Sequence, residues 1–318
     1  MKEVSVTESF GEAAIDLDRR ASFAVGGISP FAAALFGGAL FGGVEAAFAA
    51  DADLGLGDPA KRARARAKIM ASAGAETVYT FYRVHTFAYL HAGNLRPLFT
   101  THVLNARVCR PASPTSYAFT TYEAGLVTAF DSDDVIDTWA NPFTNETVKV
   151  WPLINGPLAV EAGPDGIGTA AALTLKPRGM RIDIMGDLVF MPTVSAVTTP
   201  NAFQPDAWPK ESSGSEFHWD SHFTYISPVA AVADASTDKS PAIFYLQNLG
   251  SWYPWMRMAG QAGRMYGRAF GRKLTGFDDI PPPARRNLEA RIPEIFDLAN
   301  WKSPRDRDDD YMKANRKS

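Results

Sequence analysis

The chain has 318 residues, of which 46% are hydrophobic and 21% are charged. These values are typical of a globular protein with one large domain or two ordinary ones. Its single cysteine excludes an intramolecular disulfide framework and a cysteine-based zinc cluster. The formal net charge is −3 at pH 7, and residues 50–318 alone hold equal numbers of basic and acidic residues. No single-sign electrostatic field is therefore expected to attract nucleic acid or anionic lipid.

The first 49 residues have the pattern of a twin-arginine export signal. Arg19 and Arg20 precede a Gly/Ala-rich apolar run over residues 21–44, and residues 47–49 (Ala-Phe-Ala) supply a small-x-small cleavage pattern. The glycines make that run too weakly apolar for a permanent membrane anchor. We expect the twin-arginine export machinery to carry the protein to the periplasm, residues 1–49 to be removed, and the mature form to contact no membrane.

The rest of the chain divides into a short N-terminal segment, one domain and a tail. Residues 50–75 are predicted to be a linker with a short helix. The basic run in that helix, over residues 61–68, is typical of a solvated helix face. Residues 76–300 are predicted to form a single domain, and residues 301–318 a charged tail that frays.

From residue 76 onward the sequence is rich in β-branched and aromatic residues and is interrupted by turn residues. Strands are predicted over 76–89, 97–110, 116–128, 137–151 (with a turn at 141–145), 173–176, 180–192, 216–227 and 243–250. Many short strands with almost no helix between them indicate an antiparallel barrel or sandwich. We predict a mainly β fold, an antiparallel, calycin-like β-barrel, with a C-terminal helix over 285–299 packed on it at one end.

The predicted strand over 216–227 holds two of the five histidines and alternates strictly between polar and mostly aromatic residues. Its polar face carries His218, Asp220 and His222, and this face lines either a cavity or water. In a cavity, an imidazole beside a carboxylate suits proton transfer at pH 7, so we interpret these three residues as catalytic. Two alternatives stay open. One is a solvent-facing strand, and the other is a metal site that takes a further ligand from His85, Glu123 or His102.

Cationic and aromatic side chains elsewhere complete the predicted site. Arg107, on the strand over 97–110, is predicted to stabilise a developing phenoxide, with Arg257 as the alternative. A tryptophan-rich segment beside Arg257 suits a flat apolar ligand with a polar edge. No nucleotide-binding glycine motif opens a helix after a strand, so no cofactor is expected. The predicted substrate-binding residues are Arg83, His85, Trp252, Trp255 and Arg257.

Two blocks of the sequence resemble a known family. The residues that carry the resemblance are Trp139 to Glu146, Ser251 to Met258, Gly263, and Gly271 to Lys273. They are similar to the W-x-N-P-aromatic-T-x-E turn and the S-P-W-x-P-W-M-x-M-G…G…G-x-K block of the domain of unknown function 1838. Bacterial members of that family often carry twin-arginine signals. The resemblance spans roughly residues 75–300, with departures at Tyr253 and at Ala259-Gly260.

Proteins that look like this chain are associated with the breakdown of plant-derived aromatic compounds. Together with the predicted acid–base residues, this association favours a cofactor-independent periplasmic lyase or isomerase that acts by acid–base catalysis on an aromatic or polycyclic small molecule. One concrete substrate is a lignin-type phenylcoumaran dimer, which would lose formaldehyde to give a stilbene. That reaction needs a base, an acid for the departing phenoxide, and an aromatic slot. The alternatives are a non-catalytic small-molecule-binding barrel and a metal-dependent hydrolase.

Overall fold

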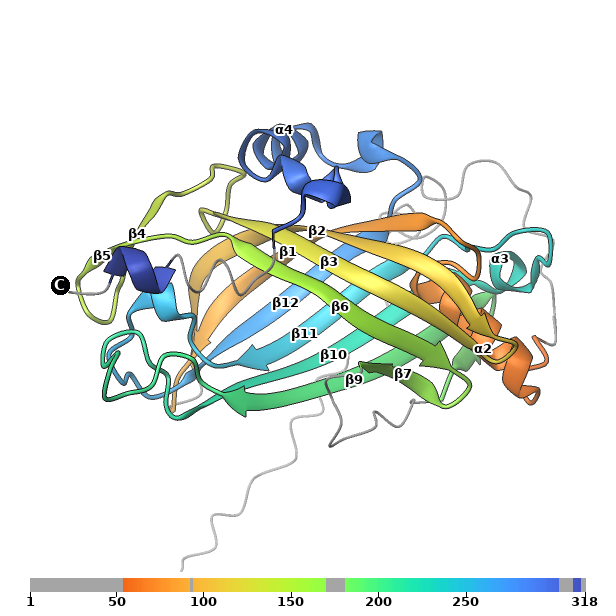
Figure 1. The fold of residues 1–318 in the computed structure, drawn as a ribbon, viewed down its shortest axis with the longest axis horizontal. Coiled ribbons are helices and arrows are strands. Elements are labelled where there is room, and N and C mark those ends of the chain that lie inside the picture. The colour runs from red at the N-terminus through yellow and green to blue at the C-terminus, as the bar shows by residue number, and fades with distance from the viewer. Residues whose placement is uncertain (1–53, 92–93, 170–180, 303–310, 316–318) are drawn as a thin grey trace, which may run out of the picture. The chain divides into compact units, whose positions relative to one another are not determined.

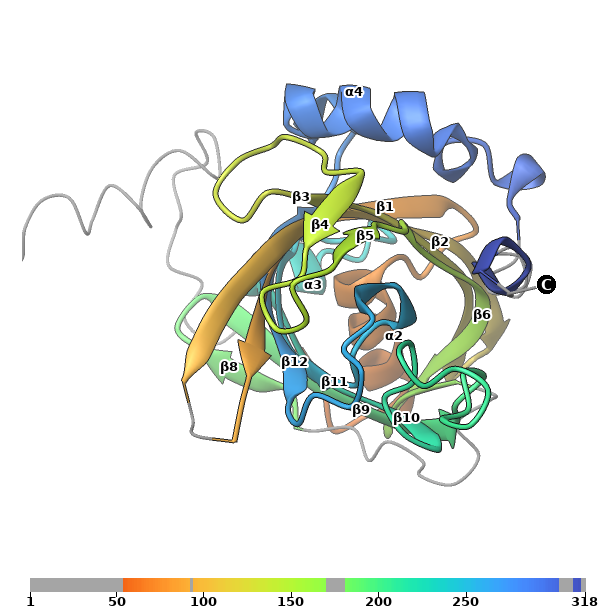
Figure 2. The same ribbon diagram turned by 90° about the vertical axis from the view of Figure 1, so that its left-hand side faces the viewer.

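A computed structural model describes residues 54–91, 94–169, 181–302 and 311–315 (Figure 1). It confirms the predicted mainly β, antiparallel fold. Ten strands form one antiparallel sheet in the order β7-β6-β3-β2-β1-β12-β11-β10-β9-β8, and the sheet curls around a central axis (Figure 2). The two edge strands, β7 and β8, are not paired with each other in the described part of the chain.

The strands match most of the predicted ranges. They are β1 (Thr77–Tyr89), β2 (Leu95–Ser113), β3 (Ser116–Thr128), β6 (Leu153–Gly163), β7 (Gly166–Thr169), β8 (Asp183–Met185), β9 (Leu188–Pro200), β10 (Glu216–Pro228), β11 (Ile243–Gly250) and β12 (Arg264–Lys273). A separate hairpin pairs β4 (Thr138–Ala140) with β5 (Thr147–Lys149) around the predicted turn. The sequence does not predict β6, β7 or β12, and the strand predicted at 173–176 lies outside the described residues.

The helices are α2 (Pro59–Met70), α3 (Val229–Ala233) and α4 (Pro282–Arg291), with short 3-10 turns η1 (Pro254–Met256), η2 (Phe277–Asp279), η3 (Pro293–Ile295) and η4 (Leu298–Asn300). None of these helices is long and apolar enough to cross a membrane.

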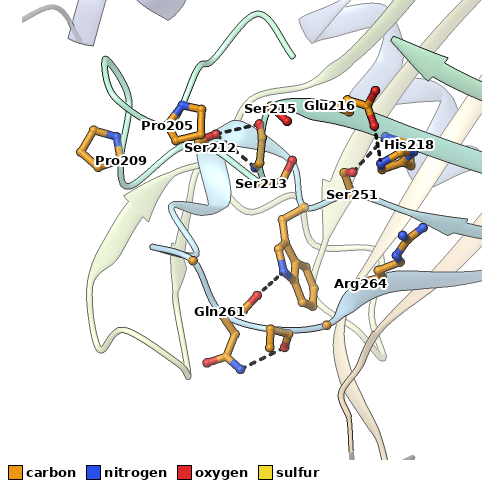
Figure 3. Close-up of a pocket in the computed structure, with 15 residues that line it drawn as sticks. Pro205, Pro209, Ser212, Ser213, Ser215, Glu216, His218, Ser251, Gln261 and Arg264 are labelled. Atoms are coloured by element: carbon orange, nitrogen blue, oxygen red, sulfur yellow. Dashed lines mark hydrogen bonds and ion pairs between the residues drawn. The ribbon is translucent and has the colours of Figure 1, made fainter. Parts of the chain in front are cut away.

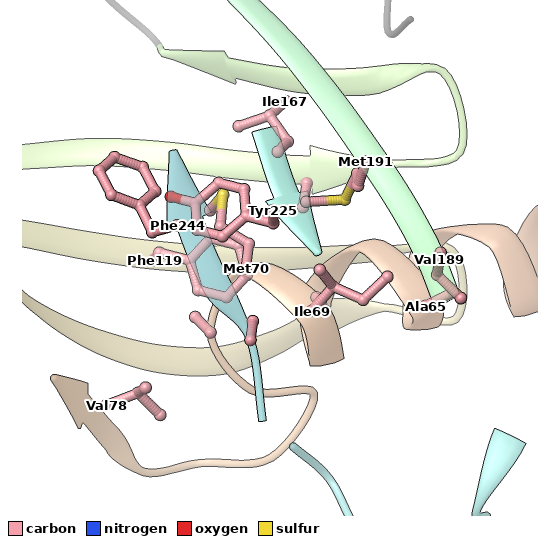
Figure 4. Close-up of a cluster of buried hydrophobic side chains, with 14 of the residues drawn as sticks. Ala65, Ile69, Met70, Val78, Phe119, Ile167, Val189, Met191, Tyr225 and Phe244 are labelled. Atoms are coloured by element: carbon pink, nitrogen blue, oxygen red, sulfur yellow. The ribbon is translucent and has the colours of Figure 1, made fainter. Parts of the chain in front are cut away.

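Helix α2 lies inside the curled sheet (Figure 2), so the interpretation of its basic run as a solvated face is wrong. Ala63, Ala67 and Ile69 are fully buried in an apolar cluster that includes strand residues from around the barrel (Figure 4). The alanines make one side of the helix narrow enough to fit there. The last basic side chain of the run is buried and reaches backbone oxygens instead of water: Lys68 Nζ donates to the carbonyls of Val232 (3.0 Å) and Asp234 (2.6 Å).

The C-terminal end of α2 is held by two basic side chains from the inner face of the sheet. Lys273 Nζ, on β12, donates to the carbonyl oxygens of Lys68 (2.6 Å) and Ala71 (2.7 Å). Arg107 Nη1, on β2, donates to the carbonyl of Met70 at 3.4 Å. The last carbonyls of a helix have no partners within the helix, so these side chains satisfy groups that would otherwise be buried unpaired.

Helix α4 packs on the outer face of β1, β2 and β3. Leu288, Ile292 and Ile295, from α4 and the turn that follows it, form a buried cluster with outer-face side chains such as Leu104 and Leu126. The predicted C-terminal helix therefore does pack on the barrel, but it covers one side and not an end. Pro293 ends it earlier than predicted, because proline cannot donate the backbone hydrogen bond that would continue the helix.

An aromatic cluster fills the barrel end opposite α2, and it joins the two blocks that carry the family resemblance. The rings of Trp139 and Trp255 lie 5.9 Å apart at 82°. Asn141 Nδ2 donates to the carbonyl of Met256 at 2.7 Å. Tyr311 is buried in the same cluster, so the expectation that the whole tail frays is wrong at this residue.

Candidate functional site

Polar side chains lie on the inner face of the sheet, the face that contacts α2, between the apolar cluster around α2 and the aromatic end cluster. We call this row the polar belt. Its members are Thr101, Asn105, Arg107, Glu123, Ser221 and Asn248. All of them are buried except Glu123, which is half-buried and so in reach of solvent. Buried polar groups in a barrel interior require partners, and a ligand can supply those that the protein does not.

Glu123 on β3 is the only carboxylate of the polar belt. Tyr82 on β1 donates a short hydrogen bond to its Oε1. No described residue hydrogen-bonds Oε2, which leaves one carboxylate oxygen available to a ligand. Burial, followed by the charge of Glu123, holds the pKa of Tyr82 well above its ordinary value, so Tyr82 stays a phenol that donates to the carboxylate. Asn105 lies opposite Glu123 on β2, and its buried Oδ1 has no partner either.

Arg107 supplies the positive charge beside this carboxylate. Its Nη2 donates to the hydroxyl oxygen of Tyr225 on β10 at 3.0 Å, and its Nη1 donates to Thr80 Oγ1 at 3.3 Å. Burial raises the pKa of Tyr225 in spite of the neighbouring guanidinium. Tyr225 therefore keeps its own proton, with its oxygen accepting from Arg107. The structure thus places the predicted Arg107 in the barrel interior, close to the carboxylate–phenol pair.

A row of four aromatic rings lies near the same carboxylate. Phe217 and Trp219 on β10 stack at 6.2 Å, Trp219 stacks on Tyr253 at 5.7 Å, and Tyr253 stacks on Trp255 at 6.3 Å. Burial, followed by the charge of Glu123, raises the pKa of Tyr253. The Tyr253 hydroxyl has no hydrogen-bond partner in the described part of the chain. We call Phe217, Trp219, Tyr253 and Trp255 the aromatic row.

The predicted catalytic strand turns its polar residues the other way. Phe223 and Tyr225, which alternate with them on β10, pack with the cluster around α2. His218, Asp220 and His222 consequently lie on the outer face of the sheet, where His222 is exposed. The structure does not bring these three residues to Arg107, and their catalytic role stays a prediction.

His218 lines a surface pocket of about 540 Å³ at the end of β10 (Figure 3). Its Nδ1 lies 3.0 Å from Thr198 Oγ1, and its Nε2 lies 3.6 Å from a carboxylate oxygen of Glu216. The ring is therefore oriented by Thr198 and Glu216, and not by Asp220 as predicted. Ser251 Oγ accepts from the backbone N–H of His218 at 3.0 Å, and no hydrogen bond joins this hydroxyl to the imidazole in the structure of the described residues.

Arg83 and His85 also lie on the outer face. Arg83 Nη2 contacts Asp133 Oδ1 at 2.9 Å, and the buried His102 contacts the same oxygen through Nε2 at 3.3 Å. His85 Nδ1 lies 3.2 Å from Thr100 Oγ1. Burial, and then the charge of Arg83, lower the pKa of His102 to about 4. The structure brings Arg83 and His85 together, but on the opposite side of the sheet from the polar belt.

The remaining predicted substrate-binding residues are engaged in packing and ion pairs. Trp252 is buried, and its Nε1 donates to the carbonyl of Gln261 at 2.9 Å. Trp255 is buried in the end cluster, although it also closes the aromatic row. Arg257 forms ion pairs with Glu146 (3.2 Å) and Glu211 (3.1 Å). Arg257 thus ties the two family blocks together and is not free to hold a phenoxide.

Sequence reasoning missed Tyr82, Asn105, Tyr225 and Tyr253 and treated Glu123 only as a spare metal ligand. One signal was available: Glu123 is a lone carboxylate within a strand that is otherwise uncharged. The three residues named as possible metal ligands do not share a face of the sheet: Glu123 lies on the inner face, whereas His85 and His102 lie on the outer face. Among the described residues, no group of three or more His, Cys, Asp or Glu side chains is arranged to hold a metal ion.

The fold and the inner face together define a curled antiparallel β-barrel that encloses a helix and holds a carboxylate–phenol pair beside an arginine. Residues 75–311 match the model of a family described as protein of unknown function (DUF1838), and the chain belongs to that family. The match confirms the resemblance drawn from the two sequence blocks. No curated protein matches the chain.

Proposed function

We propose that this protein is a lyase or isomerase that acts by proton transfer on an aromatic or polycyclic small molecule, and that the reaction takes place at the polar belt. The observation that carries the proposal is the Glu123 carboxylate. It is held by Tyr82 through one oxygen and has its other oxygen free of described partners. A half-buried carboxylate with a fixed orientation and one open lone-pair site has the geometry of a general base.

The groups around Glu123 supply the other parts of such a reaction. The aromatic row offers rings on which a flat substrate can stack. Tyr253 offers a hydroxyl proton near the carboxylate, and Arg107 with Tyr225 offers positive potential and a hydrogen bond to oxygen that becomes negative. Asn105 Oδ1 offers a buried acceptor for a substrate hydroxyl. In this proposal Glu123 replaces His218 or His222 as the base, Tyr253 serves as the acid, and Arg107 keeps its predicted role as phenoxide stabiliser.

A phenylcoumaran dimer illustrates how these residues would work. Glu123 takes the phenol proton, electrons move through the ring, and the dihydrofuran C–O bond breaks with its electron pair on the departing phenoxide. Tyr253 protonates that phenoxide, leaving a quinone methide. The Tyr253 phenolate then takes the proton of the γ-hydroxyl, and the C–C bond to that carbon breaks to release formaldehyde. The bonding pair forms the stilbene double bond and restores the aromatic ring as a phenolate, which regains the proton held by Glu123. Protons balance, and the sum is substrate to stilbene plus formaldehyde.

The test is to incubate purified protein of residues 50–318 with a panel of phenolic dimers and steroids and to analyse the mixtures by mass spectrometry. Turnover that persists with a chelator supports the proposal, and formaldehyde released with a stilbene supports its lyase form. Retention of a compound without change would instead identify a binding barrel. Turnover abolished by the chelator and restored by a metal ion would identify the metal-dependent hydrolase.

The proposal includes export to the periplasm, which is supported by the twin-arginine pattern around Arg19 and Arg20. These residues lie outside the part of the chain that the structure describes.

A further inference from the structure

The surface pocket at the end of β10 contains an arginine, Arg264, that is unpaired among the described residues. Three residues that line the pocket carry titratable side chains: Glu216, His218 and Arg264. Glu216 and His218 contact each other at 3.6 Å. Arg264 has neither an ion pair nor a hydrogen bond to any described residue, although it is half-buried. A half-buried guanidinium without an anion is a natural site for a ligand's oxyanion.

The strand register sets hydroxyl donors beside this guanidinium. Gly250 on β11 is paired with both Trp219 on β10 and Met265 on β12. The next residue, Ser251, therefore lies in a row with His218 on one side and Arg264 on the other. Because Ser251 Oγ accepts from the His218 backbone N–H, its own hydroxyl proton points elsewhere and is free to donate.

The opposite wall of the pocket adds further hydroxyl groups. The loop before β10 contributes Ser212, Ser213 and Ser215 (Figure 3). Ser212 is occupied with Gly214, whose carbonyl it donates to at 3.1 Å. The Ser215 hydroxyl has no partner in the described part of the chain, and Ser213 Oγ only accepts, from Asn201 at 3.5 Å. Both hydroxyl protons are thus available.

We infer that this pocket binds a small organic oxyanion, a carboxylate or a phosphate monoester, through Arg264 with Ser251 as a second donor. The pocket volume of about 540 Å³ is far larger than a bare inorganic ion needs and falls in the range of small-molecule sites. Glu216 limits the negative charge of the anion that can bind, because its carboxylate repels a dianion more than a monoanion. The site lies on the outer side of the strand end and is separate from the polar belt.

Isothermal titration calorimetry tests this inference. The protein of residues 50–318 is titrated with benzoate, phenyl phosphate, inorganic phosphate and benzyl alcohol. We expect both aromatic anions to bind. Benzyl alcohol should bind at least about tenfold more weakly, because it lacks the charge that Arg264 recognises. Arg264→Gln should weaken the binding of both anions about tenfold, and Glu216→Gln should strengthen it.

Two matched controls make the result specific. Arg268→Gln changes an exposed arginine on the same strand that does not line the pocket, and it should leave the affinity unchanged. Arg110→Gln changes an exposed arginine on β2 that does not line the pocket, and it should also leave the affinity unchanged. Equal binding of the anions by wild type and Arg264→Gln, absence of saturable binding, or inorganic phosphate binding as tightly as phenyl phosphate would each overturn the inference.

Discussion

Three buried or half-buried phenols affect the chemistry available to Glu123. Tyr82 donates to one of the Glu123 oxygens, and burial followed by the charge of Glu123 raises the pKa of Tyr82 and of Tyr253. Burial also raises the pKa of Tyr225, against the opposing effect of Arg107. All three phenols therefore remain protonated at neutral pH. A carboxylate among protonated phenols is a base next to its own acids, and Arg107 keeps the local charge balanced.

Replacing Glu123 should show whether catalysis takes place on the inner or on the outer face of the sheet. Glu123→Gln keeps the shape of the side chain and an oxygen to accept from Tyr82, but removes the proton acceptor. We expect turnover of a compound identified by the panel to fall by about a hundredfold or more, with little change in melting temperature. His222→Ala, which removes an exposed outer-face imidazole, should leave both quantities near wild type.

The reverse result has a clear meaning. Full activity in Glu123→Gln together with loss of activity in His218→Ala or His222→Ala would return catalysis to the strand predicted from the sequence. Asp220→Asn is the third variant of this test. If Asp220 fixes the tautomer of a catalytic imidazole, its replacement by an amide should lower the rate.

The sequence could not predict the polar belt because β1 is apolar on both faces. Val78, Tyr82 and Val84 face the interior, while Tyr79 and Phe81 pack outside among the residues around α4. The alternation of apolar and polar side chains along a strand normally distinguishes the inner face of a barrel from the outer face. A helix that covers the outer face makes that face apolar too, so the difference in polarity is lost. The strand at 216–227 keeps its contrast because no described helix covers it, and its polar side proves to be the outer one.

At the scale of elements, the enclosed helix explains why β12 ends in a lysine. Burial lowers the pKa of Lys273 to about 7, from an ordinary value of 10.5. Its neighbours in β12 also serve the interior: a side chain at Gly267 would overlap Asn248 of the polar belt, and one at Gly271 would meet the backbone of Phe81. These glycines interrupt the alternation from which strands are predicted, which is why the sequence does not predict β12.

The depressed pKa of Lys273 predicts a pH dependence of stability. A lysine whose pKa falls on folding contributes stability that is complete above its unfolded pKa and is lost as the pH falls through its folded pKa. Between pH 7 and pH 9, the free energy of unfolding of the wild type should therefore rise relative to that of Lys273→Met, by on the order of 2 kcal/mol. Urea unfolding of both proteins at the two pH values, followed by tryptophan fluorescence, measures the difference.

The comparison with Lys273→Met cancels the titration of other groups. Lys273→Met should itself be less stable at both pH values, because the carbonyl of Ala71 would lose the partner that Lys273 provides. A difference that is independent of pH, or that shrinks as the pH rises, would show that Lys273 is not held neutral in the folded protein.

At the scale of the whole molecule, the residues with the strongest sequence signal build the architecture, and the candidate chemistry lies elsewhere. Asn141, Glu146 and Arg257 join the two family blocks by a hydrogen bond and an ion pair at one barrel end. The two blocks form a recognisable sequence pattern, and that pattern identified the family, whereas the alternation of strand and turn residues predicted the fold. The polar belt is assembled from single residues on several strands, and no local pattern marks them.

Export to the periplasm would require the twin-arginine pair, Arg19 and Arg20. The expected cleavage leaves residues 50–58 ahead of α2, whose buried alanines must be enclosed as the sheet curls. The twin-arginine route carries proteins that are already folded, so enclosure of α2 would come before transport. Changing Arg19 and Arg20 together to Lys preserves the charge but removes the pair that this route reads. The precursor should then accumulate, folded, in the cytoplasm, as judged by cell fractionation and by resistance of residues 54–302 to limited proteolysis. Normal export of the Lys-Lys form, or a mature N-terminus far from residue 50, would contradict the export signal.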